Sequence, residues 1–207
     1  AVAAKAKAPA RKAKPPVAQK RDWPKGAKKT PMPGFTEPEL AKLKPKPPTD
    51  EGWIHEIKFD GYRLQVKIEH GRVTMLTRSG LDWTEKFGRD IVDAFGSVAV
   101  ETAVLDGELV VERDTGASDF SALQHDLSEG RYDRFVFYAF DLLYLDGYSL
   151  LNVSLLERKH LLESLLPDDS GKLRYSAHFN EDGGLVLNHA CRLSLEGVVS
   201  KQRDSKY

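Results

Sequence analysis

Lys58 opens the hexapeptide Lys-Phe-Asp-Gly-Tyr-Arg of residues 58–63, the stretch with the clearest chemical signal in the chain. An alternating apolar run at residues 53–57 precedes it and predicts that Lys58 lies near the end of a strand. Asp60-Gly61 then predicts a tight turn, with a returning strand over residues 62–69. A lysine at a strand end can be aimed at a bound phosphate, and its amine becomes a nucleophile when burial or nearby cations lower its pKa. The alternative interpretation is a hairpin with solvated charges.

Four further segments follow this lysine in order. They are Thr-Arg-Ser-Gly at 77–80, Leu-Asp-Gly-Glu-Leu-Val-Val at 105–111, Phe-Asp-Leu-Leu-Tyr-Leu-Asp-Gly at 140–147 and Glu-Gly-Val-Val-Ser-Lys at 196–201. With residues 56–63, they resemble in order and spacing the successive motifs of ATP-dependent DNA ligases. The amino-acid sequences of residues 56–63 and 196–201 are most similar to the ligase module of bacterial multifunctional end-joining ligases. The resemblance runs from about residue 33 to residue 207.

This resemblance implies a phosphate and sugar side of the site. Lys58 is the nucleophile and carries AMP as a phosphoramidate. Arg63 reaches the ribose or the phosphates, for which a planar guanidinium is suited, and Arg78 contacts a phosphate. Glu108 accepts a hydrogen bond from a ribose hydroxyl. The alternative for both arginines is a surface ion pair.

The resemblance also implies a base slot and a metal ligand. Phe140 is the adenine-stacking ring, with Phe137 as the second choice, although an aromatic strand is more often plain core. Glu56 lies near the adenine edge and Lys201 approaches a phosphate. Glu196 binds the catalytic Mg²⁺ or Mn²⁺; its alternative is a solvated strand end.

The function implied is an ATP-dependent DNA ligase that seals DNA nicks or ends in end-joining repair, with ATP as the AMP donor. Fused polymerase and phosphoesterase domains and an end-bridging protein are the implied partners. The resemblance also implies a further lysine motif and an oligonucleotide-binding domain after residue 201, and the 207 residues contain neither. Alternatives are an RNA ligase, a capping-type enzyme, or a nucleotide- or DNA-binding module that does not seal.

Composition sets the broad class. The chain has 207 residues, 41% of them hydrophobic, which suffices for one domain with a core. It begins with Ala1, so we expect a piece of a longer protein. The single Cys191 excludes an internal disulfide framework and favours a reduced, cytosolic protein. The resemblance implies the bacterial cytosol or nucleoid. There is no apolar run of membrane length and no signal peptide, so no membrane partner is expected. A serine-hydrolase elbow and a Gly-Lys-Ser/Thr phosphate loop are both absent.

The zero net charge hides an asymmetry. Residues 1–50 hold 13 basic and 4 acidic residues, a net charge of +9, so the remaining residues hold 18 and 27, a net charge of −9. Ten of the 11 prolines also lie in the first 50 residues. Residues 1–30 therefore predict a flexible basic linker before a ligase domain at 31–207. The linker could attract nucleic-acid phosphates or serve only as a solubilising spacer. Phe35, Leu40 and Leu43 are candidates to hold the next stretch on the domain.

The elements that must position these residues follow from periodicity. Strands are predicted at about 54–59, 64–69, 73–77, 104–111, 135–141, 172–176 and 197–201, and helices at 84–95, 120–129, 155–166 and 181–193. Asp82, Asp119, Ser154 and Asn180 are the expected N-caps. Asp60-Gly61 and His70-Gly71 predict hairpins, so the fold class is α+β with largely antiparallel sheets. The resemblance implies the nucleotidyltransferase fold, with the nucleotide in a cleft between such sheets.

Overall fold

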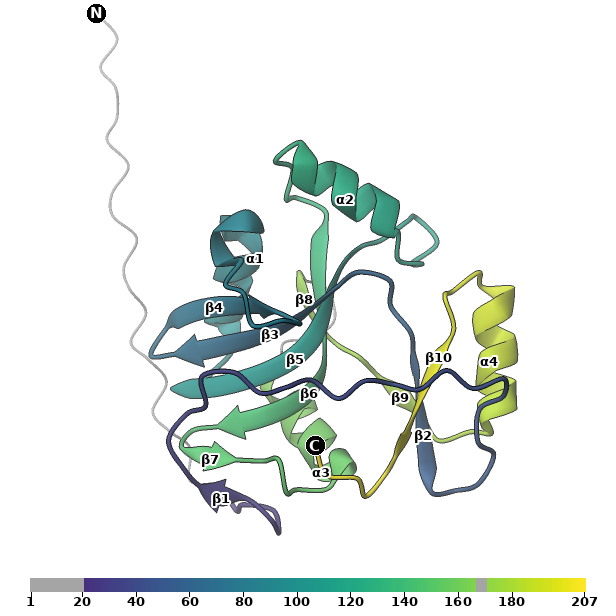
Figure 1. The fold of residues 1–207 in the computed structure, drawn as a ribbon, viewed down its shortest axis with the longest axis horizontal. Coiled ribbons are helices and arrows are strands. Elements are labelled where there is room, and N and C mark those ends of the chain that lie inside the picture. The colour runs from purple at the N-terminus through teal and green to yellow at the C-terminus, as the bar shows by residue number, and fades with distance from the viewer. Residues whose placement is uncertain (1–20, 167–170) are drawn as a thin grey trace, which may run out of the picture.

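The computed structural model describes residues 21–166 and 171–207. Two sheets and the helices around them make up this part of the chain (Figure 1). The larger sheet has the strand order β1-β7-β6-β5-β3-β4, with β8 beside β6, and the smaller has the order β10-β2-β9. Every pair is antiparallel except β6 with β8. The α+β prediction with antiparallel sheets flanked by helices is confirmed.

The bounds of the elements are as follows. The strands are β1 Lys28–Lys29, β2 Trp53–Ile57, β3 Tyr62–Glu69, β4 Arg72–Thr77, β5 Thr102–Val111, β6 Phe135–Leu145, β7 Tyr148–Ser149, β8 Leu173–Tyr175, β9 His178–Phe179 and β10 Val198–Gln202. The helices are α1 Arg89–Ala94, α2 Phe120–Ser128, α3 Leu155–Leu165 and α4 Gly183–Arg192, with short 3₁₀ turns at Thr84–Lys86 and Phe95–Ser97.

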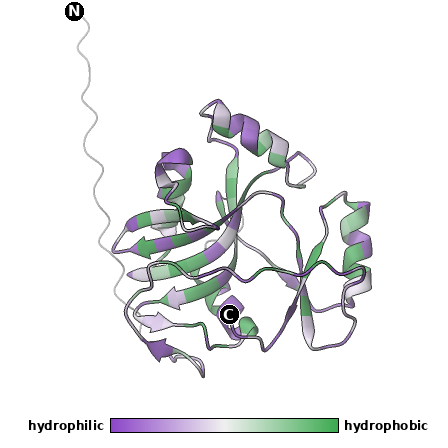
Figure 2. Cartoon of the chain, in the orientation of Figure 1, coloured by the Kyte–Doolittle hydropathy of each residue, from purple (hydrophilic) through white to green (hydrophobic). Residues whose placement is uncertain are grey.

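The main core lies on the larger sheet. Apolar side chains of β3, β5 and β6 are buried there, among them Leu64, Leu109 and Phe137. Figure 2 colours much of the larger sheet as hydrophobic. Helix α3 packs against β6. Helix α4 packs against β2 and β10 of the smaller sheet and buries Val186 and Ala190. Each sheet is therefore backed by a helix, and the strand ends of both are fixed in space.

The predicted hairpin at Asp60-Gly61 is wrong. Strand β2 belongs to the smaller sheet and β3 to the larger, so residues 58–61 are the link between the two sheets. An added Cβ on Gly61 would overlap the carbonyl oxygen of Leu109 on β5, so the link crosses the strand at backbone distance. The hairpin at His70-Gly71 is confirmed, since β3 pairs with β4 and both turn residues have positive φ.

Three helix predictions need correction. The predicted helix at 84–95 is broken at Gly88, whose φ of 75° lies outside the helical region, into a 3₁₀ turn and α1. Helix α4 is capped by Asp182, not Asn180, because the Asp182 carboxylate accepts from the amides of Gly184 and Leu185. Ser154 begins α3 but bonds the Glu157 side chain, not a backbone amide. Asp119 caps α2 as predicted.

The N-terminal part of the described chain lies on the domain. Trp23 stacks on Tyr148 at 4.0 Å between ring centroids, and Lys28 and Lys29 pair with β7. Residues 21–30 therefore do not form part of a free linker, while residues 1–20 of that prediction lie outside the described residues. We name residues 36–46 the strap.

The strap crosses the front of both sheets in Figure 1. Its backbone at Thr36 exchanges two hydrogen bonds with the buried Gln65 side chain, at 2.9 and 3.0 Å. Of the three apolar candidates, Leu40 and Leu43 are 64% and 100% exposed, so the expectation is wrong for them. Phe35 is half-buried and its ring lies beside Gly80. The hydrogen bonds between the Thr36 backbone and the Gln65 side chain hold this stretch instead of the two leucines.

Candidate active site

A cavity of about 890 Å³ lies where the two sheets face each other, within the size range of ligand sites. The smaller sheet contributes Glu56 and Lys201, and the larger sheet contributes Arg63, Glu108 and Phe140. Lys58 and Arg78 also line it, and of the predicted site residues Glu196 alone is not among its lining residues. The fold thus brings seven of the eight around one cavity.

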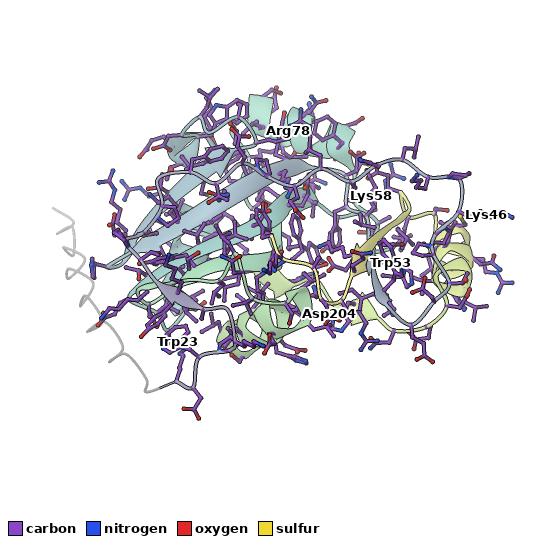
Figure 3. All side chains as sticks on the ribbon, turned by 60° about the horizontal axis from the view of Figure 1, so that its bottom comes forward. Trp23, Lys46, Trp53, Lys58, Arg78 and Asp204 are labelled. Carbon is purple, nitrogen blue, oxygen red and sulfur yellow. The ribbon has the colours of Figure 1, made fainter. Side chains whose placement is uncertain are left out.

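Lys58 and Glu196 meet beside this cavity. The antiparallel pairing of β2 with β10 continues into the bond from the Lys58 amide to the Gly197 carbonyl, at 2.9 Å. This register places the two side chains together, and the Lys58 ammonium donates to the Glu196 carboxylate. Both side chains are partly exposed, so a ligand in the cavity can reach them. Figure 3 shows Lys58 between Arg78 and Trp53.

Arg63 is held rigidly on β3. Its guanidinium makes a bidentate pair with Asp106 of β5, at 3.1 and 2.8 Å, and also donates to the Glu39 carbonyl of the strap. Burial lowers the pKa of Arg63, but the hydrogen bonds and charge of Asp106 outweigh burial and the net shift is upward. Tyr207 donates to the same carboxylate at 2.7 Å. The Arg63 guanidinium therefore stays charged, and its hydrogen bonds fix its orientation.

Glu108 is a mostly buried carboxyl in the cavity wall. It lies opposite Arg63 in the β3–β5 register. Burial raises its pKa to about 8; Arg63 and Lys58 oppose the shift, and Asp106 and Glu196 add to it. At neutral pH this group is therefore largely protonated, and a neutral carboxyl can donate a hydrogen bond as well as accept one.

The Phe140 ring lies in the cavity wall between two cations. The Arg63 guanidinium is 5.3 Å and the Lys201 ammonium 4.6 Å from its centroid. Phe137, the second choice for a base-stacking ring, is fully buried in the core and packs edge-to-face against Phe95. That alternative is wrong, because side chains alternate along β6 and this one points away from the cavity.

Glu56 lies at the base of the cavity with its carboxylate bound. Lys159 of α3 is 2.8 Å from one oxygen and Lys201 is 2.9 Å from the other. Burial raises the pKa of Glu56, but the two ammonium groups lower it more, so the carboxylate stays ionised. Both oxygens already have cationic partners.

Arg78 follows β4 in an exposed turn that reaches the cavity. It makes no hydrogen bond or ion pair with any residue in the described ranges 21–166 and 171–207. Its guanidinium is thus free to bind a ligand, which fits the predicted phosphate contact.

Three residues that hold this site were not identified as site residues from sequence. Asp106 fixes Arg63, Tyr207 fixes Asp106, and Lys159 fixes Glu56. Asp106 carried a weak signal, since strand alternation places it on the same face as Glu108. The other two contacts join residues 101 and 103 positions apart, for which no local pattern exists.

The carboxylates at the cavity can hold a metal ion only when a bound ligand supplies further oxygen atoms. No cluster of three His, Cys, Asp or Glu able to hold a metal occurs among the described residues. Glu196 and Glu108 are close enough for each charge to influence the other. Mg²⁺ is commonly bound by one or two carboxylates together with substrate phosphates and water, so Glu196 fits such an ion. In the described ranges no helix is long and apolar enough to cross a membrane.

Comparisons with known proteins agree with this geometry. The family profile "ATP dependent DNA ligase domain" matches residues 38–207. A "Multifunctional non-homologous end joining protein LigD" of Pseudomonas aeruginosa is 44% identical over 93% of this chain, which covers 23% of that relative. The "SPbeta prophage-derived DNA ligase-like protein LigB" of Bacillus subtilis is 34% identical over 84% of the chain and 63% of the relative. The chain spans less than a quarter of the first of these relatives.

Solved structures show the same fold. A mycobacterial DNA ligase D complexed with ATP and MES is 35% identical, with a TM-score of 0.64 over 77% of this chain and 51% of that chain. The ligase domain of Mycobacterium tuberculosis LigD is 37% identical, with a TM-score of 0.65 over 77% of this chain and 50% of that one.

Proposed function

Because this chain belongs to the family of ATP-dependent DNA ligase domains, we propose that it is the adenylation domain of a longer ligase and that Lys58 carries the AMP. The observation that carries this proposal is the convergence of the Lys58 amine and the Glu196 carboxylate beside a cavity lined by Arg63, Arg78 and Lys201. Adenylyl transfer requires a nucleophile, a proton acceptor and cationic groups that bind the nucleotide.

The first step is attack on ATP. The Lys58 ammonium gives up a proton, for which Glu196 is the adjacent acceptor, and the amine attacks the α-phosphorus. A P–N bond forms, the bond from the α-phosphorus to the bridging oxygen breaks, and pyrophosphate leaves. In the second step a DNA 5′-phosphate oxygen attacks the same phosphorus, and the Lys58 amine is the leaving group. A DNA 3′-hydroxyl then attacks the activated phosphate, and AMP is released.

Each wall of the cavity has a part in binding ATP. Phe140 stacks on the adenine, and the main chain near Glu56 meets the adenine edge. Glu108 and Arg63 hold the ribose, while Arg78 and Lys201 contact phosphates. Glu196 would hold Mg²⁺ or Mn²⁺, which when bound offsets the charge that builds up on the phosphates.

The wider role we propose is the sealing of DNA nicks or ends in bacterial end-joining repair, in the cytosol at the nucleoid. It rests on the likeness to the LigD relatives, which are named for non-homologous end joining. A polymerase and a phosphoesterase in the same protein and an end-bridging partner belong to this proposal. Labelling with ATP against GTP tests the capping alternative, and sealing of nicked DNA against nicked RNA tests the RNA ligase.

The experiment is AMP labelling of the full-length protein with α-³²P-ATP. Lys58→Ala should abolish the label and leave the circular dichroism spectrum unchanged. Lys58→Arg should also fail, because a guanidinium stays protonated and cannot attack. Lys67→Ala on β3, outside the cavity, is the matched control and should label normally. A label mapped by mass spectrometry to any lysine other than Lys58 contradicts the proposal.

A further inference from the structure

Lys159 is a charged residue that the proposed chemistry does not use. Helix α3 buries Leu155, Arg158, Lys159, Leu162 and Leu165, which share one helical face. The Lys159 side chain on that face is 0% exposed. Burial lowers its pKa, and the charge of Glu56 opposes this shift. A buried ammonium is costly unless paired and hydrogen-bonded, so its contacts show what holds it there.

The Lys159 ammonium contacts groups from both sheets. It is 2.8 Å from the Glu56 carboxylate on β2 of the smaller sheet. On the other side it donates to the carbonyl of Ser176 at 2.9 Å, and the carbonyl of Phe140 on β6 is 3.5 Å away. Ser176 is itself tied to the larger sheet, because its amide donates to the Ala139 carbonyl at 2.8 Å. A single side chain thus connects the two walls of the cavity.

Lys201 completes this connection from the cavity side. Its ammonium is 2.9 Å from the second oxygen of Glu56 and 4.6 Å from the centroid of the Phe140 ring. The Glu56 carboxylate is shared between two ammonium groups, so the three charges sum to +1. Without Lys159, Glu56 would pair with Lys201 alone and would be free to draw it off the ring.

We propose that Lys159 is a positioning residue that sets the spacing between Glu56 and Phe140, the two walls of the slot for the base of ATP. This inference rests on the proposed function, in which Phe140 stacks on adenine. Lys159 touches no reacting atom. Its loss should therefore weaken ATP binding without slowing the transfer of AMP to Lys58.

The test is the concentration dependence of AMP labelling in the full-length protein. Lys159→Met keeps an unbranched side chain one atom shorter and removes the charge and the donors. We expect the KM for ATP to rise about tenfold, while the rate at saturating ATP stays within about twofold of the unmodified enzyme. The matched control is Lys172→Met, which removes a lysine that donates to the carbonyls of Tyr132 and Asp133 away from the cavity. It should lower thermal stability and leave KM unchanged.

A purely structural role gives a different result. Partial unfolding lowers the labelled fraction and leaves the KM of the folded molecules unchanged, so a lower melting temperature with an unaltered KM overturns the inference. The inference is also overturned if the labelling rate of Lys159→Met at saturating ATP falls by as large a factor as the KM rises. If Lys159→Met does not fold, Lys159→Gln keeps an amide donor without the charge and is expected to give the same rise in KM. Failure of the unmodified protein to label at all contradicts the proposed function; a KM that neither variant changes contradicts only the role of Lys159.

Discussion

Glu108 shows how one buried carboxyl links stability to pH. Its pKa in the folded protein is raised from 4.5 to about 8, chiefly by burial. Between these values the folded state keeps a proton that the unfolded chain has lost, so the free energy of unfolding falls as pH rises. Below this window both states are protonated and the penalty vanishes. Above it both are ionised and the penalty is constant.

Glu108→Gln should remove this dependence. We expect the variant to be more stable than the unmodified chain at pH 8 and nearly equal at pH 4, because glutamine has no proton to lose. Urea unfolding at several pH values measures the effect. Asp114→Asn, in an exposed turn, should leave the slope as it is. Parallel pH curves for Glu108→Gln and the unmodified chain would contradict the pKa shift.

Phe140 and Phe137 provide a matched pair of rings on one strand. Phe140→Ala should weaken ATP binding by about 1–3 kcal/mol, the range for an aromatic ring stacked on a base. Phe137→Ala should lower the free energy of unfolding by about 3–5 kcal/mol through loss of core packing and leave ATP affinity unchanged below its melting transition. Calorimetric titration and thermal melting separate the two. If Phe140→Ala leaves the ATP affinity unchanged, the ring lines the cavity but does not stack on the adenine.

At the scale of elements, the link between β2 and β3 decides where Lys58 lies. Gly61 passes so close to the Leu109 carbonyl that a methyl group cannot fit. In Gly61→Ala the link must move away from β5, and Lys58 at its start moves relative to Arg63 on β3. We expect AMP labelling to fall at least tenfold. Gly34→Ala, where nothing lies within 4 Å of the added carbon, should behave as the unmodified protein, and normal labelling by Gly61→Ala would contradict this role for the link.

The same link shows where sequence reasoning stops. Alternation predicts the strands before and after it correctly, because each buries one face on a sheet. A Gly at a chain reversal and a Gly at a close crossing give the same local pattern, so the hairpin prediction was wrong. The parallel pairing of β8 with β6 is also set by tertiary structure. Likewise, the predicted helix at 84–95 has a helical period, and only the fold shows that it ends and restarts at Gly88.

The site residues were predictable for a different reason. Short motifs on or beside strands contain Lys58, Arg63, Glu108, Phe140 and Lys201, and the resemblance assigned them together. The structure brings them to one cavity. Their supporting partners come from distant elements, and no motif marks a buried lysine on a helix as the partner of a glutamate on a strand. Prediction therefore identified residues that line the cavity and missed the residues that hold them in place.

At the scale of the whole molecule, charge is divided between the cavity and the rest of the domain. Residues 51–207 carry a net charge of −9, yet the cavity is lined by Lys58, Arg63, Arg78, Arg158, Lys201 and Lys206 against four carboxylates. A triphosphate is attracted locally, while a long polyanion such as DNA meets an acidic surface elsewhere. We expect the basic N-terminal residues to offset that repulsion.

Deleting residues 1–20 tests this balance. The segment holds six basic and no acidic residues, so its removal should weaken DNA binding most at low salt. The slope of log K against log salt should become shallower by at most about 0.9 for each DNA phosphate that the segment neutralises. ATP binding should not change, because every described residue that lines the cavity lies at or after Glu39. A scrambled segment of the same composition should restore the affinity, since counterion release depends on charge and not on order. If the scrambled segment behaves like the deletion, the N-terminal residues bind through a specific sequence and the charge argument is wrong.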